Sequence, residues 1–283
     1  QTDARQITLI CHTNVPEHCF LDLAIDDRRI ETRVLQPPRR HELRFDDLPP
    51  GPKRVELWLP NYGATVIESL AVNAAAVVGP WHDRRSRWVT HGSSLTHCRR
   101  AYSPMRAWPS IVAEAMGWHL TNLGFGGQCK MDPIVARTLA AMPADFISLC
   151  LGINTYDGDF TPRTWSSAAL GFLLTIRDRQ PTTPIVVFSP MISPPRETTP
   201  GKTGLTLVAM RQWLAEVVEK LRARGDQHIV HVDGLQVFGP ADAHLMPDQL
   251  HPGGDGIELM GRRITEIFKS KLPEIGGEAL LPR

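Results

Sequence analysis

The hydrophobic pattern of the chain changes its period near residue 80, and this change limits the folds that the chain can adopt. Before this point, apolar and polar residues alternate in short segments separated by turn residues, which is typical of strands with one buried face. After it, short apolar runs alternate with segments that repeat apolar residues every three or four positions, as amphipathic helices do. The chain has 283 residues, enough to bury two cores. We therefore predict two domains, residues 1–80 and residues 81–283.

Six short alternating segments fill the first 80 residues, and Asp, Pro and Gly residues separate them. No helical period occurs among them, so the segments predict a small all-β sandwich. No group of residues in this part suggests catalysis. The predicted strands are Ile7–Cys11, Cys19–Ile25, Arg29–Leu35, Glu42–Phe45, Arg54–Leu59 and Thr65–Leu70.

Two cysteine-histidine pairs lie close together near the amino terminus, Cys11-His12 and His18-Cys19. Four such side chains could bind zinc, but their spacing matches none of the usual zinc motifs. A hairpin turn through residues 14–16, with the cysteines on the flanking strands, is the simpler interpretation. We predict no metal site here.

Strands and helices alternate after residue 80. Phe146–Leu151 is almost continuously apolar, as a central parallel strand buried on both faces would be. Repeated strand-helix units predict a doubly wound parallel sheet with right-handed crossovers. The other predicted strands end at Thr90 or cover His119–Leu123, Pro184–Ser189 and His228–Val232, and the predicted helices cover Trp108–Met116, 133–142, 162–179, 207–221 and 257–267.

Polar or glycine-rich segments follow the predicted strands. They are Gly92–Leu95, Gly124–Gly127, Gly152–Thr155 and, beyond the last strand, Asp248–His251. The carboxyl ends of parallel strands meet at one edge of a sheet, where open α/β sheets bind their ligands. We therefore expect a serine hydroxyl, glycine amides, an asparagine amide and an Asp/His pair to lie close together.

These segments resemble the motifs of the SGNH or GDSL hydrolases over about residues 86–270. The family's Gly-Asp-Ser-Leu motif aligns with Gly92–Leu95, which makes Ser94 the matching nucleophile and puts Ser93 in place of the usual Asp. The last motif, Asp-x-x-His, is matched by Asp248 and His251 and includes the proline that commonly follows.

Two segments between Ser94 and Asp248 are similar to the family's second and third motifs. Gly127 resembles the glycine that lends a backbone N–H in the second motif. Asn154 matches the asparagine of the third motif, Gly-x-Asn-Asp, and Thr155 replaces its final Asp. The resemblance implies an oxyanion hole formed by the amides of Ser94 and Gly127 and by the Asn154 side chain.

The chemistry requires these residue types independently of the resemblance. A serine hydroxyl is a poor nucleophile near neutral pH, so a base must take its proton, and His251 is the candidate. Asp248, on the same loop, can accept from the other ring nitrogen and stabilise the imidazolium. The elbow motif Gly-x-Ser-x-Gly of the α/β-hydrolases is missing because Thr96 occupies the place of its second glycine.

The resemblance implies a flavodoxin-like three-layer α/β/α domain preceded by a jelly-roll-like sandwich. It also implies acyl-ester chemistry through an acyl-enzyme, with hydrolysis of a carboxylic ester as the main hypothesis and no metal or organic cofactor. The alternative is an acyltransferase that moves an acyl group from a thioester to a hydroxyl of a natural product or a sugar. A binding protein on a degenerate scaffold is a third hypothesis, motivated by the replaced Asp residues.

Charge and composition limit the partners. Lys and Arg total 31 and Asp and Glu total 30, so no net field would attract nucleic acid or an anionic membrane. No apolar run approaches the roughly 20 residues of a membrane span. The arginine clusters at 84–87 and at 99–100 are interpreted as solvated faces. We expect a small-molecule ester or acyl thioester as substrate, with an alcohol or sugar as a second substrate if the acyl group is transferred.

Five cysteines without a framework spacing favour reduced thiols, which predicts a cytoplasmic protein. Gln1 is followed by no hydrophobic leader, although removal of upstream residues would leave export open. The Pro-rich loop 190–202 is interpreted either as a substrate-facing lid or as a surface connector, and Trp108 either as part of a hydrophobic acceptor site or as packing.

Overall fold

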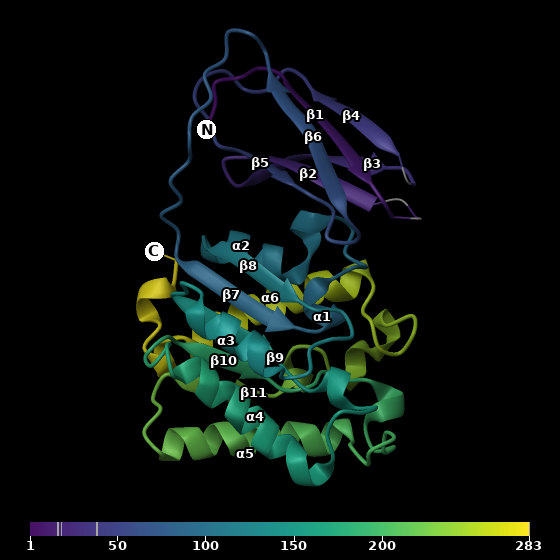
Figure 1. Ribbon diagram of the computed structural model, residues 1–283, viewed down its shortest axis with the longest axis vertical. Coiled ribbons are helices and arrows are strands. Elements are labelled where there is room, and N and C mark those ends of the chain that lie inside the picture. Colours follow the sequence, from purple (N-terminus) through teal and green to yellow (C-terminus); the bar gives the residue numbers. More distant parts are fainter. Residues whose placement is uncertain (16, 18, 38, 283) are drawn as a thin grey trace. The chain divides into compact units, whose positions relative to one another are not determined.

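The computed structural model describes residues 1–15, 17, 19–37 and 39–282. The contacts within the chain divide it into two compact units, coloured along the sequence in Figure 1. One comprises Gln1–Arg84 and Ala101–Ala107, and the other comprises Arg85–Arg100 and Trp108–Arg283. We keep the division near residue 80 as a proposed domain boundary, with the segment Ala101–Ala107 grouped by its contacts with the amino-terminal unit.

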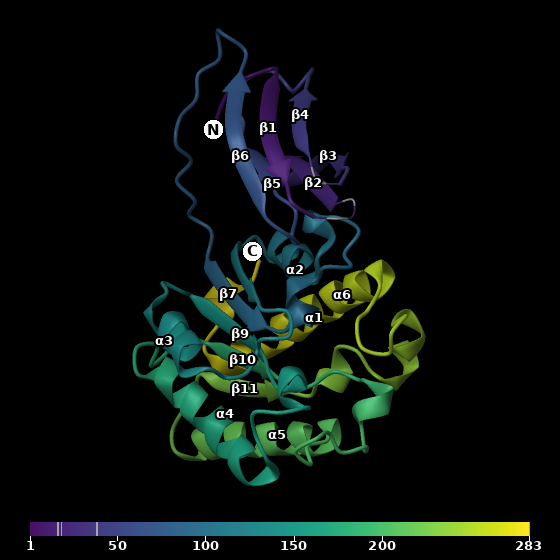
Figure 2. The ribbon, with the colours of Figure 1, turned by 45° about the vertical axis from the view of Figure 1, so that its right-hand side comes forward.

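The amino-terminal unit is all-β, and the six predicted strands are confirmed. Antiparallel pairing gives two three-stranded sheets, β4-β1-β6 and β3-β2-β5, visible in Figure 2. Alternate residues of β1, among them Ile7, Leu9 and Cys11, are buried in the core between the sheets, as the period of two predicts. The strands are β1 Ile7–Thr13, β2 Cys19–Ile25, β3 Arg28–Leu35, β4 Arg40–Phe45, β5 Val55–Trp58 and β6 Thr65–Val72.

The cysteine-histidine pairs lie partly outside the described residues, since neither His18 nor Pro16 of the predicted turn is among them. Cys11 is buried in the core, whereas the His12 ring lies beside Glu68, with Nε2 3.1 Å from a carboxylate oxygen. Neighbouring residues of a strand point to opposite faces, so Cys11 and His12 do not converge on one ion.

A buried carboxylate explains why Ala101–Ala107 belongs to the amino-terminal unit. Asp22 on β2 is 0% exposed. One carboxylate oxygen accepts the backbone N–H of Met105 at 2.8 Å, and the other accepts the Thr32 hydroxyl at 2.5 Å. Because a buried carboxylate needs such donors, Asp22 ties the segment to the sheet through its main chain.

The second unit contains a five-stranded parallel sheet of order β11-β10-β9-β7-β8. Its first strand, β7, lies inside the sheet between the second and third strands, which is the flavodoxin-like order, and the predicted fold class is confirmed. The chain therefore reverses its direction of winding at β7, and the carboxyl ends of β7 and β9 flank the switch point. The strands are β7 Arg87–Gly92, β8 His119–Gly124, β9 Phe146–Cys150, β10 Ile185–Phe188 and β11 Ile229–Val232.

Helices cover both faces of this sheet. On one face, Trp88 of β7 contacts Trp108 of α2 and Phe268 of α6, with ring centroids 5.9 and 5.6 Å apart. On the other face, a continuous apolar core joins the sheet to α3, α4 and α5. No helix in the described part of the chain is long and apolar enough to cross a membrane. The helices are α1 Ser94–His97, α2 Trp108–Met116, α3 Pro133–Ala141, α4 Pro162–Arg177, α5 Leu207–Ala223 and α6 Gly254–Lys271.

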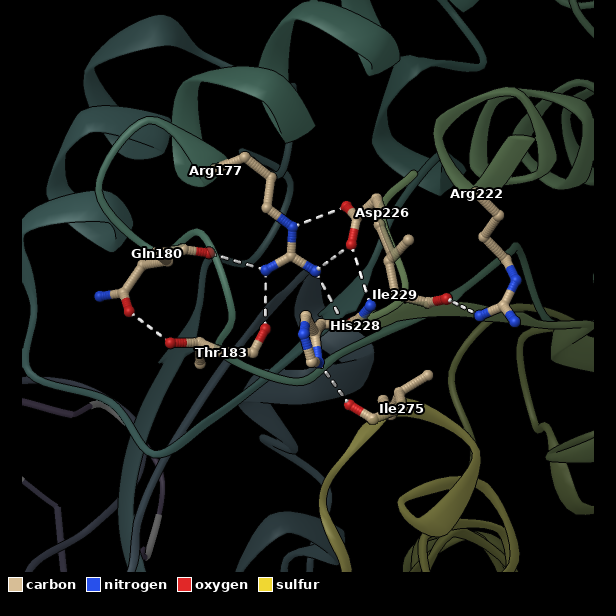
Figure 3. Close-up of polar contacts among 8 residues, drawn as sticks. All are labelled: Arg177, Gln180, Thr183, Arg222, Asp226, His228, Ile229 and Ile275. Carbon is tan, nitrogen blue, oxygen red and sulfur yellow. Dashed lines mark hydrogen bonds and ion pairs between the residues drawn. The ribbon is translucent and has the colours of Figure 1, made fainter. Parts of the chain in front are cut away.

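A nearly buried arginine joins the segments that enter β10 and β11, at the amino edge of the sheet (Figure 3). The Arg177 guanidinium pairs with both oxygens of Asp226 at 2.7 and 3.2 Å. It also donates to the carbonyls of Gln180, Thr183 and His228 at 2.7–2.8 Å. These bonds use all three guanidinium nitrogens, so only an arginine fits the arrangement.

We expect Arg177→Met to lower the free energy of unfolding by about 3–5 kcal/mol, because it leaves Asp226 with a side-chain exposure of 13% and no cationic partner. Arg177→Lys keeps the charge but loses the fork, so it should fall between wild type and Arg177→Met. Urea denaturation measures the change. At urea concentrations where the variants are still folded, their activity should stay near the wild-type value. The network lies at the amino edge of the sheet, opposite the carboxyl ends of the strands. A loss below about 1 kcal/mol would show that the network contributes little.

Candidate active site

The serine segment forms a tight turn from β7 into the four-residue helix α1. Ser93 caps this helix, because its Oγ accepts the N–H of Leu95 at 3.2 Å. A Cβ at Gly92 would lie 2.1 Å from Thr96 Oγ1 and 3.0 Å from Cys150 Cβ, so any side chain would push α1 away from the sheet. Ser93 thus supplies the acceptor that an Asp would supply there, and the replacement leaves the turn intact.

Ser94, His251 and Asp248 form one continuous hydrogen-bonded chain. Ser94 Oγ lies 2.9 Å from His251 Nε2, and His251 Nδ1 lies 2.9 Å from Asp248 Oδ2. Because the carboxylate can only accept, Nδ1 carries the proton and Nε2 is left to accept from the serine hydroxyl. The ring is therefore oriented as a general base toward Ser94 requires.

The Asp248 carboxylate also organises its own loop. Its Oδ1 accepts the backbone N–H groups of Leu250 and His251 at 3.1 and 2.7 Å. Burial acts to raise the pKa of Asp248, but these two N–H groups and the His251 ring together hold that pKa well below its usual range. Asp248 is therefore a carboxylate throughout the neutral pH range.

Arg100 contacts the same pair of residues, which the sequence pattern does not predict. Its guanidinium lies 3.0 Å from Asp248 Oδ2 and donates to the His251 carbonyl at 3.4 Å. Residues 99–100 are exposed, as a solvated face would be, but the Arg100 guanidinium also makes these two contacts. Its side chain is 43% exposed, so we assign it a modest effect on the orientation of Asp248.

Gly127 and Asn154 lie on the loops after β8 and β9. Gly127 has φ of +73° and no atom within 4 Å of where a Cβ would stand, so its conformation rather than crowding requires glycine. Asn154 Oδ1 accepts the backbone N–H of Cys129 at 3.1 Å, which fixes the amide plane. Asn154 Nδ2 makes no hydrogen bond within the described ranges, so both of its protons are available to a ligand. No hydrogen bond joins Gly127 or Asn154 to Ser94 among these same residues.

Thr155, which replaces the Asp of the third motif, is fully buried. Its hydroxyl donates to the Gly152 carbonyl at 2.6 Å and accepts the Trp165 indole N–H at 2.8 Å. These bonds fix the short helical turn Ile153–Thr155 against α4. The replacement therefore supports the turn that carries Asn154.

A buried histidine and a buried cysteine support the loop that contacts Asn154. His91 Nδ1 donates to the Leu123 carbonyl at 2.8 Å, which leaves its Nε2 to accept from the Cys129 thiol at 3.4 Å. Burial lowers the pKa of His91 and raises the pKa of the Cys129 thiol, so both groups are neutral. Together they hold the loop whose N–H orients Asn154.

We expect Asn154→Ala to lower kcat by about 10²–10³-fold if the Asn154 amide stabilises an oxyanion, as removal of one such donor does elsewhere. Since Oδ1 is used by Cys129 N–H, Asn154→Asp keeps that acceptor and replaces the donor with an oxygen, and it should be at least as impaired. Steady-state kinetics with a p-nitrophenyl ester measures both. Activity of Asn154→Ala within about threefold of wild type would exclude the oxyanion role.

Trp108 supports the serine helix. It is 0% exposed, and its indole N–H donates to the Leu95 carbonyl at 2.8 Å. Of the two interpretations from the sequence, packing is correct, and Trp108 does not line an accessible acceptor site.

Comparisons with known proteins agree with this fold and these segments. The sequence model of the GDSL-like lipase/acylhydrolase family matches residues 90–259. No curated protein sequence matches the chain. A salicylyl-acyltransferase, SsfX3 from a tetracycline biosynthetic pathway, superposes with a TM-score of 0.87 at 30% identity, covering 97% of this chain and 82% of that one.

Two further solved structures share the fold at lower identity. A GDSL-like lipase from Bacteroides ovatus, itself described as putative, has a TM-score of 0.77 at 22% identity, covering 96% of this chain and 83% of that one. A family two carbohydrate esterase from Clostridium thermocellum has a TM-score of 0.70 at 15% identity, covering 96% and 91%.

The chain belongs to the GDSL-like lipase/acylhydrolase family. It is therefore an enzyme of acyl-ester chemistry, in a class that comprises serine esterases and acyltransferases. The family resemblance found in the sequence is confirmed, and the binding-protein hypothesis receives no support.

Proposed function

We propose that the protein hydrolyses a small carboxylic ester through a covalent acyl-Ser94 intermediate, with His251 as general base and acid and Asp248 as its partner. The observation that carries this proposal is the chain of two 2.9 Å contacts from Ser94 Oγ through the His251 ring to Asp248. A nucleophile, a base and an orienting carboxylate in this geometry are what acyl transfer through serine needs.

In the first half-reaction, Ser94 Oγ attacks the carbonyl carbon while His251 Nε2 takes the hydroxyl proton. The resulting oxyanion is bound by the backbone N–H groups of Ser94 and Gly127 and by Asn154 Nδ2. Collapse of this intermediate breaks the bond to the leaving group, which receives the proton from His251. In the second half-reaction, water attacks the acyl-enzyme and His251 Nε2 takes a proton from it. The bond from Ser94 Oγ to the acyl carbon then breaks, His251 returns the proton to Ser94 Oγ, and the carboxylic acid leaves.

Acyl transfer to an alcohol is the second candidate. It uses the same acyl-Ser94 but replaces water by a hydroxyl of a natural product or a sugar, with an acyl thioester as donor. The specific support is the 30% identity over 97% of this chain to a salicylyl-acyltransferase. The triad chemistry is common to both candidates, so the acceptor alone separates them.

Partitioning of the acyl-enzyme tests the two candidates. Purified protein is mixed with short-chain p-nitrophenyl esters, and the acyl adduct is followed by intact mass with and without candidate alcohols. Hydrolysis predicts an adduct that decays at one rate whatever alcohol is added, with free acid as the product. An alcohol that accelerates the decay and yields a new ester would favour transfer. Absence of turnover and of any adduct would contradict both.

We also propose a cytoplasmic location. All five cysteines are free and buried, which supports a reducing compartment. Recovery of the folded protein from the periplasm or the culture medium of the source cells would contradict this proposal.

A further inference from the structure

The Pro-rich loop after β10 is attached directly to the turn that carries Asp248 and His251. Ser193 in this loop is 0% exposed, and its Oγ donates to the Gln249 carbonyl at 2.9 Å. Gln249 lies between the two residues proposed for the triad. Fifty-six positions separate Ser193 from Gln249 in the sequence, so this bond is a long-range contact between two loops.

Gln249 has an unusual backbone conformation. Its φ is +60°, which residues other than glycine rarely adopt. Its N–H donates to the Met246 carbonyl at 3.1 Å, and the neighbouring N–H groups of Leu250 and His251 donate to Asp248. The Gln249 carbonyl is the group of this turn that faces the loop, and Ser193 is its donor. A turn held in a disfavoured conformation depends on such surrounding bonds.

Ser193 is itself fixed by a nearly buried ion pair. Its N–H donates to Glu197 Oε1 at 3.1 Å, and the Glu197 carboxylate pairs with Arg211 of α5. The side chains of Glu197 and Arg211 are 18% and 8% exposed. Arg211 also donates to the Pro190 carbonyl at 3.1 Å, at the start of the same loop. The network therefore runs from Arg211 of α5 through Glu197 and Ser193 to Gln249 in the Asp248–His251 turn.

Arg196 completes the surroundings of the serine. Its guanidinium donates to Ser193 Oγ at 2.9 Å and lies over the ring of Tyr156, 5.6 Å from the centroid. With Arg196 as donor to the oxygen, the Ser193 hydroxyl proton is directed to the Gln249 carbonyl. The loop is thus bonded at Pro190, at Ser193 and at Arg196. A loop held at these points is a fixed support and not an opening lid.

We propose that Ser193 is a positioning residue of the acyl-transfer reaction: it holds the turn that sets His251 against Ser94, and Glu197 and Arg211 hold Ser193. The proposal rests on the proposed function, because it assigns Ser193 a role only through Asp248 and His251. Loss of the bond would let the turn relax and lengthen the Ser94–His251 contact, which slows proton transfer but leaves substrate binding intact.

Ser193→Ala tests the proposal, with Ser189→Ala as a matched control. Ser189 is also a buried serine after β10, 2% exposed, and its Oγ accepts the Gly234 N–H at 3.1 Å, away from the Asp248–His251 turn. Ser189→Ala removes one buried hydrogen bond, and Ser193→Ala removes two, one to Gln249 and one from Arg196, so Ser193→Ala should lose at least as much thermal stability as the control. Only Ser193→Ala is expected to lower kcat, by about three- to tenfold, with KM within twofold of wild type.

Two readouts keep the outcome separate from the proposed function. One is steady-state hydrolysis of p-nitrophenyl acetate, and the other is the rate at which a fluorophosphonate labels Ser94, which needs the base but no natural substrate. Labelling of wild type that is lost in Ser94→Ala, together with slower labelling of Ser193→Ala alone, supports the inference. Equal rates for wild type, Ser189→Ala and Ser193→Ala would overturn the inference and leave the triad standing. No Ser94 labelling in wild type would overturn the proposed function, and the inference with it.

If Ser193→Ala does not fold, Arg196→Gln gives the same test at a half-buried position. It removes a charged donor to Ser193 Oγ without emptying a buried site. We expect kcat and the labelling rate to fall about two- to threefold at unchanged KM. Rates equal to wild type in a folded Arg196→Gln protein would count against the network.

Discussion

Ser94→Ala is expected to lower ester turnover by about five to six orders of magnitude while leaving the fold intact. The variant removes the hydroxyl oxygen that we propose carries the acyl group, whereas the hydroxyl contributes little to packing because Ser94 is half-buried. His251 keeps its bond to Asp248, so the turn should not move. Steady-state kinetics on purified protein, with circular dichroism to verify folding, measures the change.

The neighbouring serine provides a matched control. Ser93→Ala removes an N-cap acceptor and should cost about 0.5–2 kcal/mol of stability, with turnover retained to within roughly tenfold. Ser93 Oγ bonds only the N–H of Leu95 among the described contacts, and no bond links it to His251. A Ser93→Ala protein as inactive as Ser94→Ala, or an active Ser94→Ala protein, would contradict the assignment of the nucleophile.

Asp248→Asn is the second large effect, and we expect kcat to fall by about 10³–10⁴-fold. An amide at this position presents an N–H where Oδ2 accepts from His251, so it favours the tautomer whose Nε2 carries the proton and cannot accept from Ser94. The amide also removes the ion pair with Arg100. Kinetics at saturating ester measure the loss, and Asp248→Glu should recover part of it because it restores a carboxylate.

The pKa of Asp248 fixes the pH range of this effect. Hydrogen bonds from the His251 backbone, the His251 ring and the Leu250 N–H outweigh the burial that acts to raise the pKa, so the pKa lies below the usual value of about 3.9. A depressed folded-state pKa gives a contribution that is complete above the unfolded value and is lost only as pH falls through the folded one. Asp248 should therefore stay a carboxylate from about pH 5 to pH 8, and Asp248→Asn should be strongly impaired at both ends of this range. Equal activity of the two proteins near pH 5 would mean that Asp248 is protonated there.

The sequence predicted much of the fold because burial patterns report local geometry. Phe146–Cys150 is apolar at each position and forms the buried central strand β9, and the alternation in Ile7–Cys11 forms β1. The Asp248 and His251 side chains were predictable as a pair because they lie three residues apart on one loop. Ser94 was proposed as the nucleophile because it matches the serine of the Gly-Asp-Ser-Leu motif at a strand exit, and its contact with His251 Nε2 supports that proposal.

The contacts that position these residues were not predictable, because they join residues far apart in the chain. Arg100 reaches the His251 carbonyl across 151 positions, and its place in an exposed, basic dipeptide suggested only solvation. Nothing in the sequence marks Ser193 within its Pro-rich loop, and only the structure shows that its hydroxyl donates to the Gln249 carbonyl. Asp22 alternates as any strand residue would, and only the tertiary structure shows that it binds Met105. Periodicity indicates which side chains are buried but not which polar groups they meet.

The most direct test of the central claim is to locate the acyl group on the protein. Wild-type protein is quenched with acid within the first turnover of a p-nitrophenyl ester, and intact mass and peptide mapping follow. We expect one added acyl group, located on Ser94, that is absent from Ser94→Ala and accumulates more slowly in Asp248→Asn. An acyl group on another residue, or rapid turnover by Ser94→Ala with the same product, would contradict it.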